Sequence, residues 1–203
     1  MVAMPAIEDD EEQQTFLADG SGPLTVRDLE RMPDDGRRYE LIDGSLIVSP
    51  APGTRHQMMA YRLFAVLDAA CPDEFYVLGA PYSVRPSETT ELQPDVLVGR
   101  AEDFTEKLLP TAPVLAVEVL SPSTTLNDLN TKKAAYERLG VPDYWVIDPH
   151  EPSLTVFELD PDGQYQEVAK VAGAESFATR RPYPVRIVPV ELLGRLAQRA
   201  PDA

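Results

Sequence analysis

Apolar and polar positions follow two different periods along this chain, and the periods predict a definite order of helices and strands. From Thr54 to Ala70 the apolar residues recur at helical spacing, and Cys71-Pro72 ends that segment. Short runs rich in Val and Leu and bounded by proline instead predict buried strands. These runs cover residues 75–78, 81–85, 93–98, 114–120 and 144–149.

Turn residues predict two β-hairpins, one in each half of the chain. Asp43-Gly44 lies between two apolar-rich runs and favours a tight type I′ turn. Asp160-Pro161-Asp162-Gly163 joins 154–159 to 165–171 in the same way. Helices are expected after Thr25 as N-cap, from about 126 to 139, and at 190–198. This order predicts an α/β or α+β sandwich with a mixed central sheet.

Length and charge bear on the domain organisation and on possible partners. At 203 residues the chain fits one domain, which we expect at 23–203, after a disordered acidic leader at 1–22. The net charge is −16, and residues 1–35 contribute half of it with ten acids and two bases. Tight nonspecific binding to DNA needs Lys and Arg against the phosphates. Any nucleic acid would therefore be held by a local patch or through metal ions.

Several kinds of site and segment are not expected from this sequence. Cys71 is the only cysteine, which excludes an intramolecular disulfide and a thiolate zinc site. The acidic N-terminus does not have the pattern of a signal peptide, and no apolar run is long enough to span a membrane. We therefore expect a cytoplasmic protein.

Two carboxylates and a lysine are the candidates for chemistry. Asp95 and Glu118 are each the lone acid of an otherwise apolar strand, where a bare carboxylate is unfavourable unless a cation pairs with it. Lys132 follows on a helix, where Tyr136 shares its face. Carboxylates, waters and substrate phosphates are the ligands that Mg²⁺ prefers, with Mn²⁺ as a substitute. The combination indicates metal-assisted phosphodiester chemistry.

Each candidate also has a simpler interpretation. Asp95 follows Pro94 and could be a turn residue, and Glu118 could be an acid at a strand edge or an acid paired with a partner. Lys132, taken alone, fits an ordinary solvated helix lysine. Only the three residues together favour the catalytic interpretation.

A set of motifs in fixed order resembles one bacterial family. They are YELIDG at 39–44, SPAP at 49–52 with His56, PDV at 94–96, VEVLSPST at 117–124, Asp128 through Lys132 to Tyr136, and GVPDYW at 140–145. Over about residues 24–170 the chain resembles the Uma-type restriction endonuclease family of the PD-(D/E)XK nuclease superfamily. The single motifs are weak, but their order is specific.

The resemblance implies a restriction-endonuclease-like fold, with a mixed central sheet flanked by helices and with N-terminal and C-terminal hairpins. It also implies a Mg²⁺-dependent endonuclease that acts on DNA, with Asp95 and Glu118 as metal ligands. The position two after Glu118 is Leu120 instead of the superfamily's lysine, and the resemblance implies that Lys132 on the following helix takes that role.

The resemblance assigns roles to three further residues and suggests an assembly. Glu40 would be an assisting acid, with an exposed hairpin acid as its alternative. His56 and Tyr136 would contact substrate, although a solvated or capping histidine is the simpler interpretation of His56. We expect a homodimer, because nucleases of this type often pair so that two sites address two strands.

Two other functions fit the same residues. The charge of −16 and the displaced lysine are compatible with a nuclease-fold protein that regulates or binds without cleaving. A phosphohydrolase acting on a small nucleotide would suit the acidic surface better than long duplex DNA does.

Overall fold

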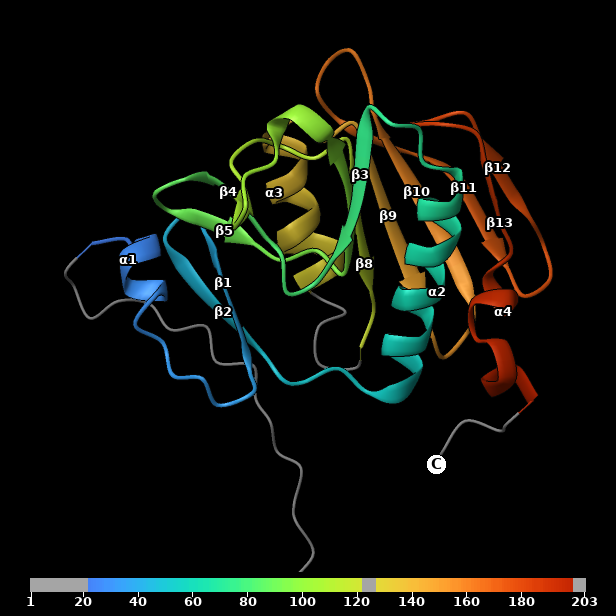
Figure 1. Cartoon of the computed structure of the whole chain (residues 1–203), viewed down its shortest axis with the longest axis horizontal. Coiled ribbons are helices and arrows are strands. Elements are labelled where there is room, and N and C mark those ends of the chain that lie inside the picture. Colours follow the sequence, from blue (N-terminus) through green and yellow to red (C-terminus); the bar gives the residue numbers. More distant parts are fainter. Residues whose placement is uncertain (1–21, 122–126, 199–203) are drawn as a thin grey trace, which may run out of the picture.

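Two mixed β-sheets lie side by side and make up most of the molecule in the computed structural model (Figure 1). The structure describes residues 22–121 and 127–198. The predicted acidic leader lies outside the described residues except for Gly22, and so does the first residue of the helix expected at 126–139. Within the described ranges, no helix is long and apolar enough to cross a membrane.

The larger sheet has six strands in the order β11-β10-β9-β8-β6-β3. Only β8 and β9 run parallel, and the other neighbouring pairs are antiparallel. Its strands are β3 (Phe75–Gly79), β6 (Val96–Arg100), β8 (Leu115–Val119), β9 (Asp143–Asp148), β10 (Ser153–Leu159) and β11 (Tyr165–Ala172).

The smaller sheet has five strands in the order β2-β1-β5-β4-β7, and β12 and β13 form a two-stranded ribbon that pairs with neither sheet. In this smaller sheet only β4 and β7 run parallel. These strands are β1 (Arg38–Ile42), β2 (Ser45–Ser49), β4 (Ser83–Ser87), β5 (Thr90–Leu92), β7 (Leu108–Leu109), β12 (Phe177–Thr179) and β13 (Val185–Ile187).

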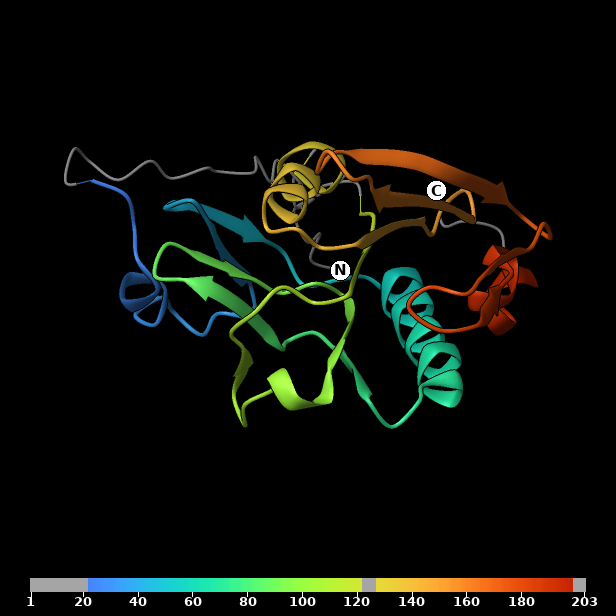
Figure 2. The same cartoon turned by 90° about the horizontal axis from the view of Figure 1, so that it is seen from above.

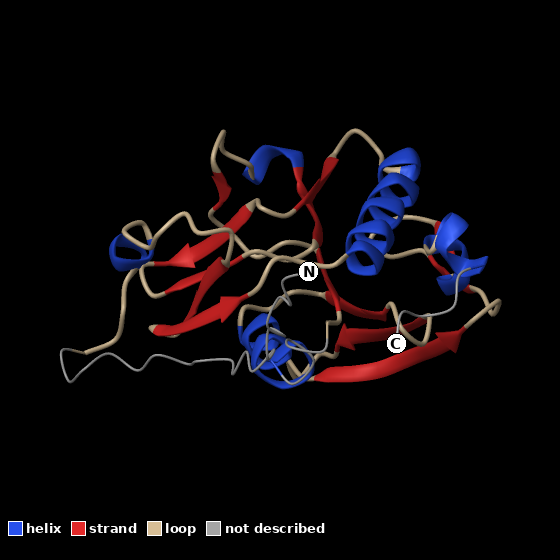
Figure 3. Ribbon diagram, turned by 90° about the horizontal axis from the view of Figure 1, so that it is seen from below, coloured by secondary structure: helices blue, strands red, loops and turns tan. Residues whose placement is uncertain are grey.

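Helices cover both faces of the larger sheet (Figures 2 and 3). On one face α2 (Thr54–Ala70) packs Leu63 and its apolar neighbours against Val117 and the other residues of the main core. On the opposite face Tyr136 of α3 (Lys133–Arg138) packs against Ala116. Neighbouring residues of β8 point to opposite faces, so this one strand contributes to both cores. The remaining helical segments are α1 (Val26–Leu29), η1 (Ala101–Asp103), η2 (Asn127–Lys132), α4 (Pro189–Leu192) and η3 (Gly194–Gln198).

The elements with the strongest sequence signals are confirmed. The helix α2 has the predicted bounds, Thr54–Ala70. Both hairpins form, and Asp43 and Gly44 have the positive φ angles, 49° and 80°, that a type I′ turn needs. The carboxylate of Asp28 accepts hydrogen bonds from the backbone N–H and the hydroxyl of Thr25 at the predicted helix start.

The predicted mixed α/β architecture is confirmed, with the larger sheet flanked by helices, but the structure also has a second large sheet that the sequence did not predict. Strands β5, β7, β12 and β13 were not predicted, and each has only two or three residues, too few for a visible alternation. The strand expected at 93–98 begins only at Val96, so Asp95 lies in the segment that enters it. The helix expected from 126 begins with η2, a wider π-type turn, before α3.

Candidate active site

Strand register brings the two predicted acids to the same place. Val96 of β6 is opposite Val117 of β8, and the next pair of positions in this antiparallel register is Asp95 and Glu118. Opposed residues of an antiparallel pair share one face of the sheet. That face is the one that α3 covers, because Ala116, two residues before Glu118, packs there. Glu118 therefore lies on the α3 side, and Asp95 lies beside this strand just before β6, where its carboxylate bonds the backbone of Val119 and also reaches His56 of α2.

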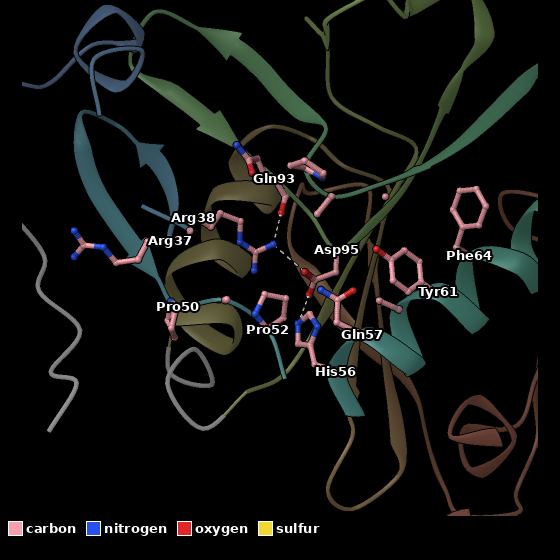
Figure 4. Close-up of a pocket in the computed structure, with 16 residues that line it drawn as sticks. Arg37, Arg38, Pro50, Pro52, His56, Gln57, Tyr61, Phe64, Gln93 and Asp95 are labelled. Atoms are coloured by element: carbon pink, nitrogen blue, oxygen red, sulfur yellow. Dashed lines mark hydrogen bonds and ion pairs between the residues drawn. The ribbon is translucent and has the colours of Figure 1, made fainter. Parts of the chain in front are cut away.

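Asp95 is held by three groups from different elements, of which Figure 4 shows Arg38 and His56. Its Oδ1 atom accepts a hydrogen bond of 2.9 Å from Nη1 of Arg38 on β1. Its Oδ2 atom accepts one of 2.8 Å from the backbone N–H of Val119 and lies 3.0 Å from Nε2 of His56 on α2. The Asp95 carboxylate is thus fixed between the two sheets and the start of the long helix.

The charge of Asp95 is favoured even though the residue is buried. Burial by itself raises the pKa of the carboxyl. The hydrogen bond from His56 and the charges of Arg38 and Lys132 lower this pKa by more than burial raises it. The net pKa of Asp95 lies well below its ordinary value. The site thus contains a fixed anion at neutral pH.

Glu118 and Lys132 form a buried ion pair. The ammonium Nζ of Lys132 lies 3.2 Å from both carboxylate oxygens of Glu118. The hydroxyl of Tyr136 donates a hydrogen bond of 2.9 Å to Oε1 of Glu118. Burial and the nearby charge of Glu118 raise the pKa of Tyr136 well above its ordinary value, so the phenol stays a donor. Lys132 and Glu118 are each only 1 % exposed.

Glu40 reaches the same cluster from the smaller sheet. Its Oε1 atom accepts a hydrogen bond of 2.8 Å from the backbone N–H of Gln93. Its Oε2 atom forms an ion pair of 2.8 Å with Nζ of Lys132. The side chain is fully buried. The ammonium of Lys132 is thus shared between Glu40 of the smaller sheet and Glu118 of the larger sheet.

All six site residues predicted from the sequence belong to one contiguous network: Glu40, His56, Asp95, Glu118, Lys132 and Tyr136. The simpler interpretations of three of them were wrong. Lys132 is not a solvated lysine, Glu40 is not an exposed hairpin acid, and His56, at 7 % exposed, is neither solvated nor a cap. Whether these residues catalyse or bind metal stays a prediction.

Arg38 is the member of the network that the sequence did not reveal. It lies two residues before Glu40 on β1, so both side chains point to the same side of the strand. Its guanidinium bonds Asp95 and lies 3.8 Å from Glu40. Burial lowers the pKa of Arg38, but Glu40 and Asp95 raise it more, so its charge is permanent. The i, i+2 spacing to Glu40 was the available signal.

Comparison with solved structures identifies the class of fold. The chain is similar to the crystal structure of a putative nuclease belonging to DUF820 from Anabaena variabilis ATCC 29413, with a TM-score of 0.66 and 20% sequence identity. The match covers 86% of this chain and 99% of that one. At this identity the likeness establishes a shared mixed α/β fold. No curated protein matches the sequence.

The family follows from the sequence itself. The model of the Uma2 family, described as "Putative restriction endonuclease", matches residues 26–188. The matched segment is most of the chain and includes every residue of the buried network. The protein therefore belongs to the Uma2 family, and the resemblance seen in the ordered motifs is confirmed.

Proposed function

We propose that this chain is a Mg²⁺-dependent endonuclease that hydrolyses phosphodiester bonds in DNA, on the restriction-endonuclease-like fold of the PD-(D/E)XK nucleases. The observation that carries the proposal is the buried network in which Asp95, Glu118 and Lys132 meet between the two sheets. The family's description, "Putative restriction endonuclease", supports the same activity.

The donor atoms in this network suit a hard divalent cation. Asp95, Glu118 and Glu40 supply buried carboxylate oxygens, the ligand type that such a cation prefers. In the described part of the chain no group of three or more His, Cys, Asp or Glu residues is placed to hold a metal ion. Mg²⁺ usually takes only one or two carboxylates and completes its shell with waters and substrate phosphates. Asp95 and Glu118 fit that pattern as the two protein ligands.

The other residues would orient the reaction. A bound Mg²⁺ would polarise an oxygen of the phosphate and lower the pKa of a water molecule. The ammonium of Lys132, beside Glu118, would position the attacking water and stabilise the negative charge that develops on phosphorus. Glu40 holds this ammonium in place, 2.8 Å away. His56 and Arg38 orient Asp95 from the two flanking elements.

The displaced lysine is compatible with this role. The superfamily pattern places lysine two residues after the acid, and here Leu120 occupies that position. Lys132 reaches the Glu118 carboxylate from η2, at 3.2 Å, so the cation is delivered from a helix instead of from the strand. The chemistry requires the ammonium near the acid, not a particular place in the chain.

Plasmid cleavage with matched variants tests the proposal. We expect the purified protein to nick or linearise supercoiled DNA with Mg²⁺, and Asp95→Asn or Glu118→Gln to abolish cleavage while the far-ultraviolet dichroism is retained. Glu91→Gln is the control, because Glu91 is a buried carboxylate that pairs with Arg85 outside the network. Full cleavage by both Asp95→Asn and Glu118→Gln would refute the assignment.

The proposal includes a homodimer, in which two sites address two strands. Light scattering after size exclusion should give twice the mass of the 22.4 kDa chain. A monomeric mass at the concentration used for the cleavage assay would exclude the homodimer, and the proposal for the hydrolytic site would still stand.

A further inference from the structure

A cavity of about 390 Å³ opens directly beside the acid network. Asp95, Arg38 and His56 form part of its wall, so the cavity is continuous with the site (Figure 4). Its size is at the lower end of the range for pockets that bury small organic ligands. The activity proposed above uses Asp95 but leaves the rest of this space without a role.

The wall away from the acids is apolar and aromatic. Tyr61 and Phe64 lie one turn apart on α2, on the side that also carries His56 and Gln57 (Figure 4). Pro52 and Pro81 are also part of the lining. Tyr61 is 63% exposed, although a large aromatic side chain gains by burial. Exposed aromatic rings beside a phosphodiester site are the groups on which nucleobases stack.

Polar groups in the lining suit the edge of a base. His56 is buried, and its Nδ1 atom has no hydrogen-bond partner in the described part of the chain. Gln57 offers both an amide donor and a carbonyl acceptor. Arg37 is also part of the lining, but its guanidinium is half exposed and paired with Asp35. The cavity thus combines a stacking surface with hydrogen-bonding groups.

A base within a duplex could not use this cavity, because its faces are stacked and its Watson–Crick edge is paired. The net charge of −16 also opposes the long run of phosphate contacts that a duplex binder makes. An unpaired nucleotide needs few phosphate contacts and has a free face and edge. These two facts favour an unpaired substrate over duplex DNA.

We infer that this cavity takes an unpaired nucleobase of single-stranded DNA, stacked on Tyr61, with its phosphate at Asp95. The inference deepens the proposed hydrolysis by naming the substrate class, and it rests on that proposal for the position of the phosphate. Tyr61 and Gln57 determine binding here, and the acids determine cleavage.

Fluorescence anisotropy tests the inference without turnover. A short fluorescein-labelled single strand and a duplex of the same sequence are titrated with the full chain in Ca²⁺. We expect the single strand to bind at least about tenfold more tightly, and Tyr61→Ala to weaken its binding about 5- to 100-fold, as the loss of one stacking contact predicts. Tyr61→Phe should retain most of the affinity. Tyr76→Ala is the matched control, because Tyr76 is 53% exposed on β3 and does not line the cavity.

Equal or tighter binding of the duplex would overturn the inference, and so would a Tyr61→Ala effect no larger than that of Tyr76→Ala. Mg²⁺-dependent cleavage of the same oligonucleotides separates the two proposals. Duplex cleavage that Tyr61→Ala leaves unchanged overturns the cavity assignment and leaves the nuclease standing. Tyr61-dependent binding of single strands without any cleavage overturns the nuclease and supports the cavity. If a mononucleotide displaced the labelled single strand as effectively as an unlabelled single strand does, the inference that the substrate is single-stranded DNA would be overturned.

Discussion

At the scale of single residues, Lys132 is the group on which the network depends. Its ammonium is shared between Glu40 and Glu118, and neither the cation nor the two acids reach bulk water. Removing one partner of such a group leaves uncompensated buried charge, which is far more unfavourable than the pair itself is favourable. Lys132 should therefore contribute to stability as well as to chemistry.

We predict that Lys132→Met lowers the free energy of unfolding by about 3–5 kcal/mol, as measured by urea denaturation at neutral pH. Lys133→Met is the control, because the Lys133 ammonium lies 3.9 Å from the centre of the Phe157 ring instead of pairing with an acid of the described ranges. We expect this variant to lose only about 0.5–1 kcal/mol of the free energy of unfolding. Equal stability of Lys132→Met and the parent protein would contradict the buried ion pair.

Asp143 gives the protein a pH-dependent stability that is independent of the site. Burial raises the pKa of Asp143 to about 6, and Arg181, 3.4 Å away, offsets this only in part. A carboxyl whose pKa is raised in the fold binds its proton more tightly there than in the unfolded chain. Stability from this group is therefore present at acid pH and is lost as pH rises between about 4 and 6.

Asp143→Asn mimics the protonated carboxyl and should remove this loss. We predict that the variant is more stable than the parent by about 1–3 kcal/mol near pH 8 and equally stable near pH 4. Thermal unfolding across pH measures the difference. A variant that is less stable than the parent at pH 8 would show that the ion pair with Arg181 dominates.

The buried network was foreseeable in part. Asp95 and Glu118 were found because an acid in an apolar strand needs a partner, and Lys132 because it follows on a helix. The burial of Glu40 and His56 could not be inferred, because it depends on how β1 and α2 pack against the larger sheet. Local sequence does not encode such distant contacts.

At the scale of elements, the β1–β2 hairpin delivers Arg38 and Glu40 to the larger sheet. Its turn requires left-handed backbone at Gly44, with φ of 80°. A Cβ at Gly44 would also collide with the side chain of Pro23. This turn fixes the register, and hence which side chains of β1 face the acids.

We predict that Gly44→Ala destabilises the protein by about 2–3 kcal/mol, because it combines left-handed strain with the collision. Gly163→Ala is the matched control. It has a similar φ of 76° in the second hairpin and open space at its Cβ, so we expect about 1 kcal/mol. Chemical denaturation measures the loss of unfolding free energy in both variants. Equal losses would show that the collision with Pro23 contributes nothing.

Elements with local signals were predicted, and elements that depend on partners were not. Helix α2 and both hairpins follow from periodicity and turn residues, and the structure confirms them. Strands β5 and β7 exist only because neighbouring strands pair with them. The second sheet was missed for the same reason, since it is completed by these short strands.

At the scale of the whole molecule, the site lies where the two sheets meet, so ion binding and folding should be coupled. We predict that Mn²⁺ or Mg²⁺ raises the melting temperature, because a ligand present at about 100 times its dissociation constant adds about 2.7 kcal/mol of stability. Glu118→Gln should reduce this shift, and Glu91→Gln should not. A shift that survives in Glu118→Gln would place the ion elsewhere.

A crystal of the protein soaked in Mn²⁺ addresses the central claim most directly, since anomalous scattering locates the ion without reference to activity. The proposal predicts one strong peak in contact with carboxylate oxygens of both Asp95 and Glu118, with the Lys132 ammonium beside it. The absence of any peak at these two residues, in crystals that bind Mn²⁺ elsewhere, would contradict it.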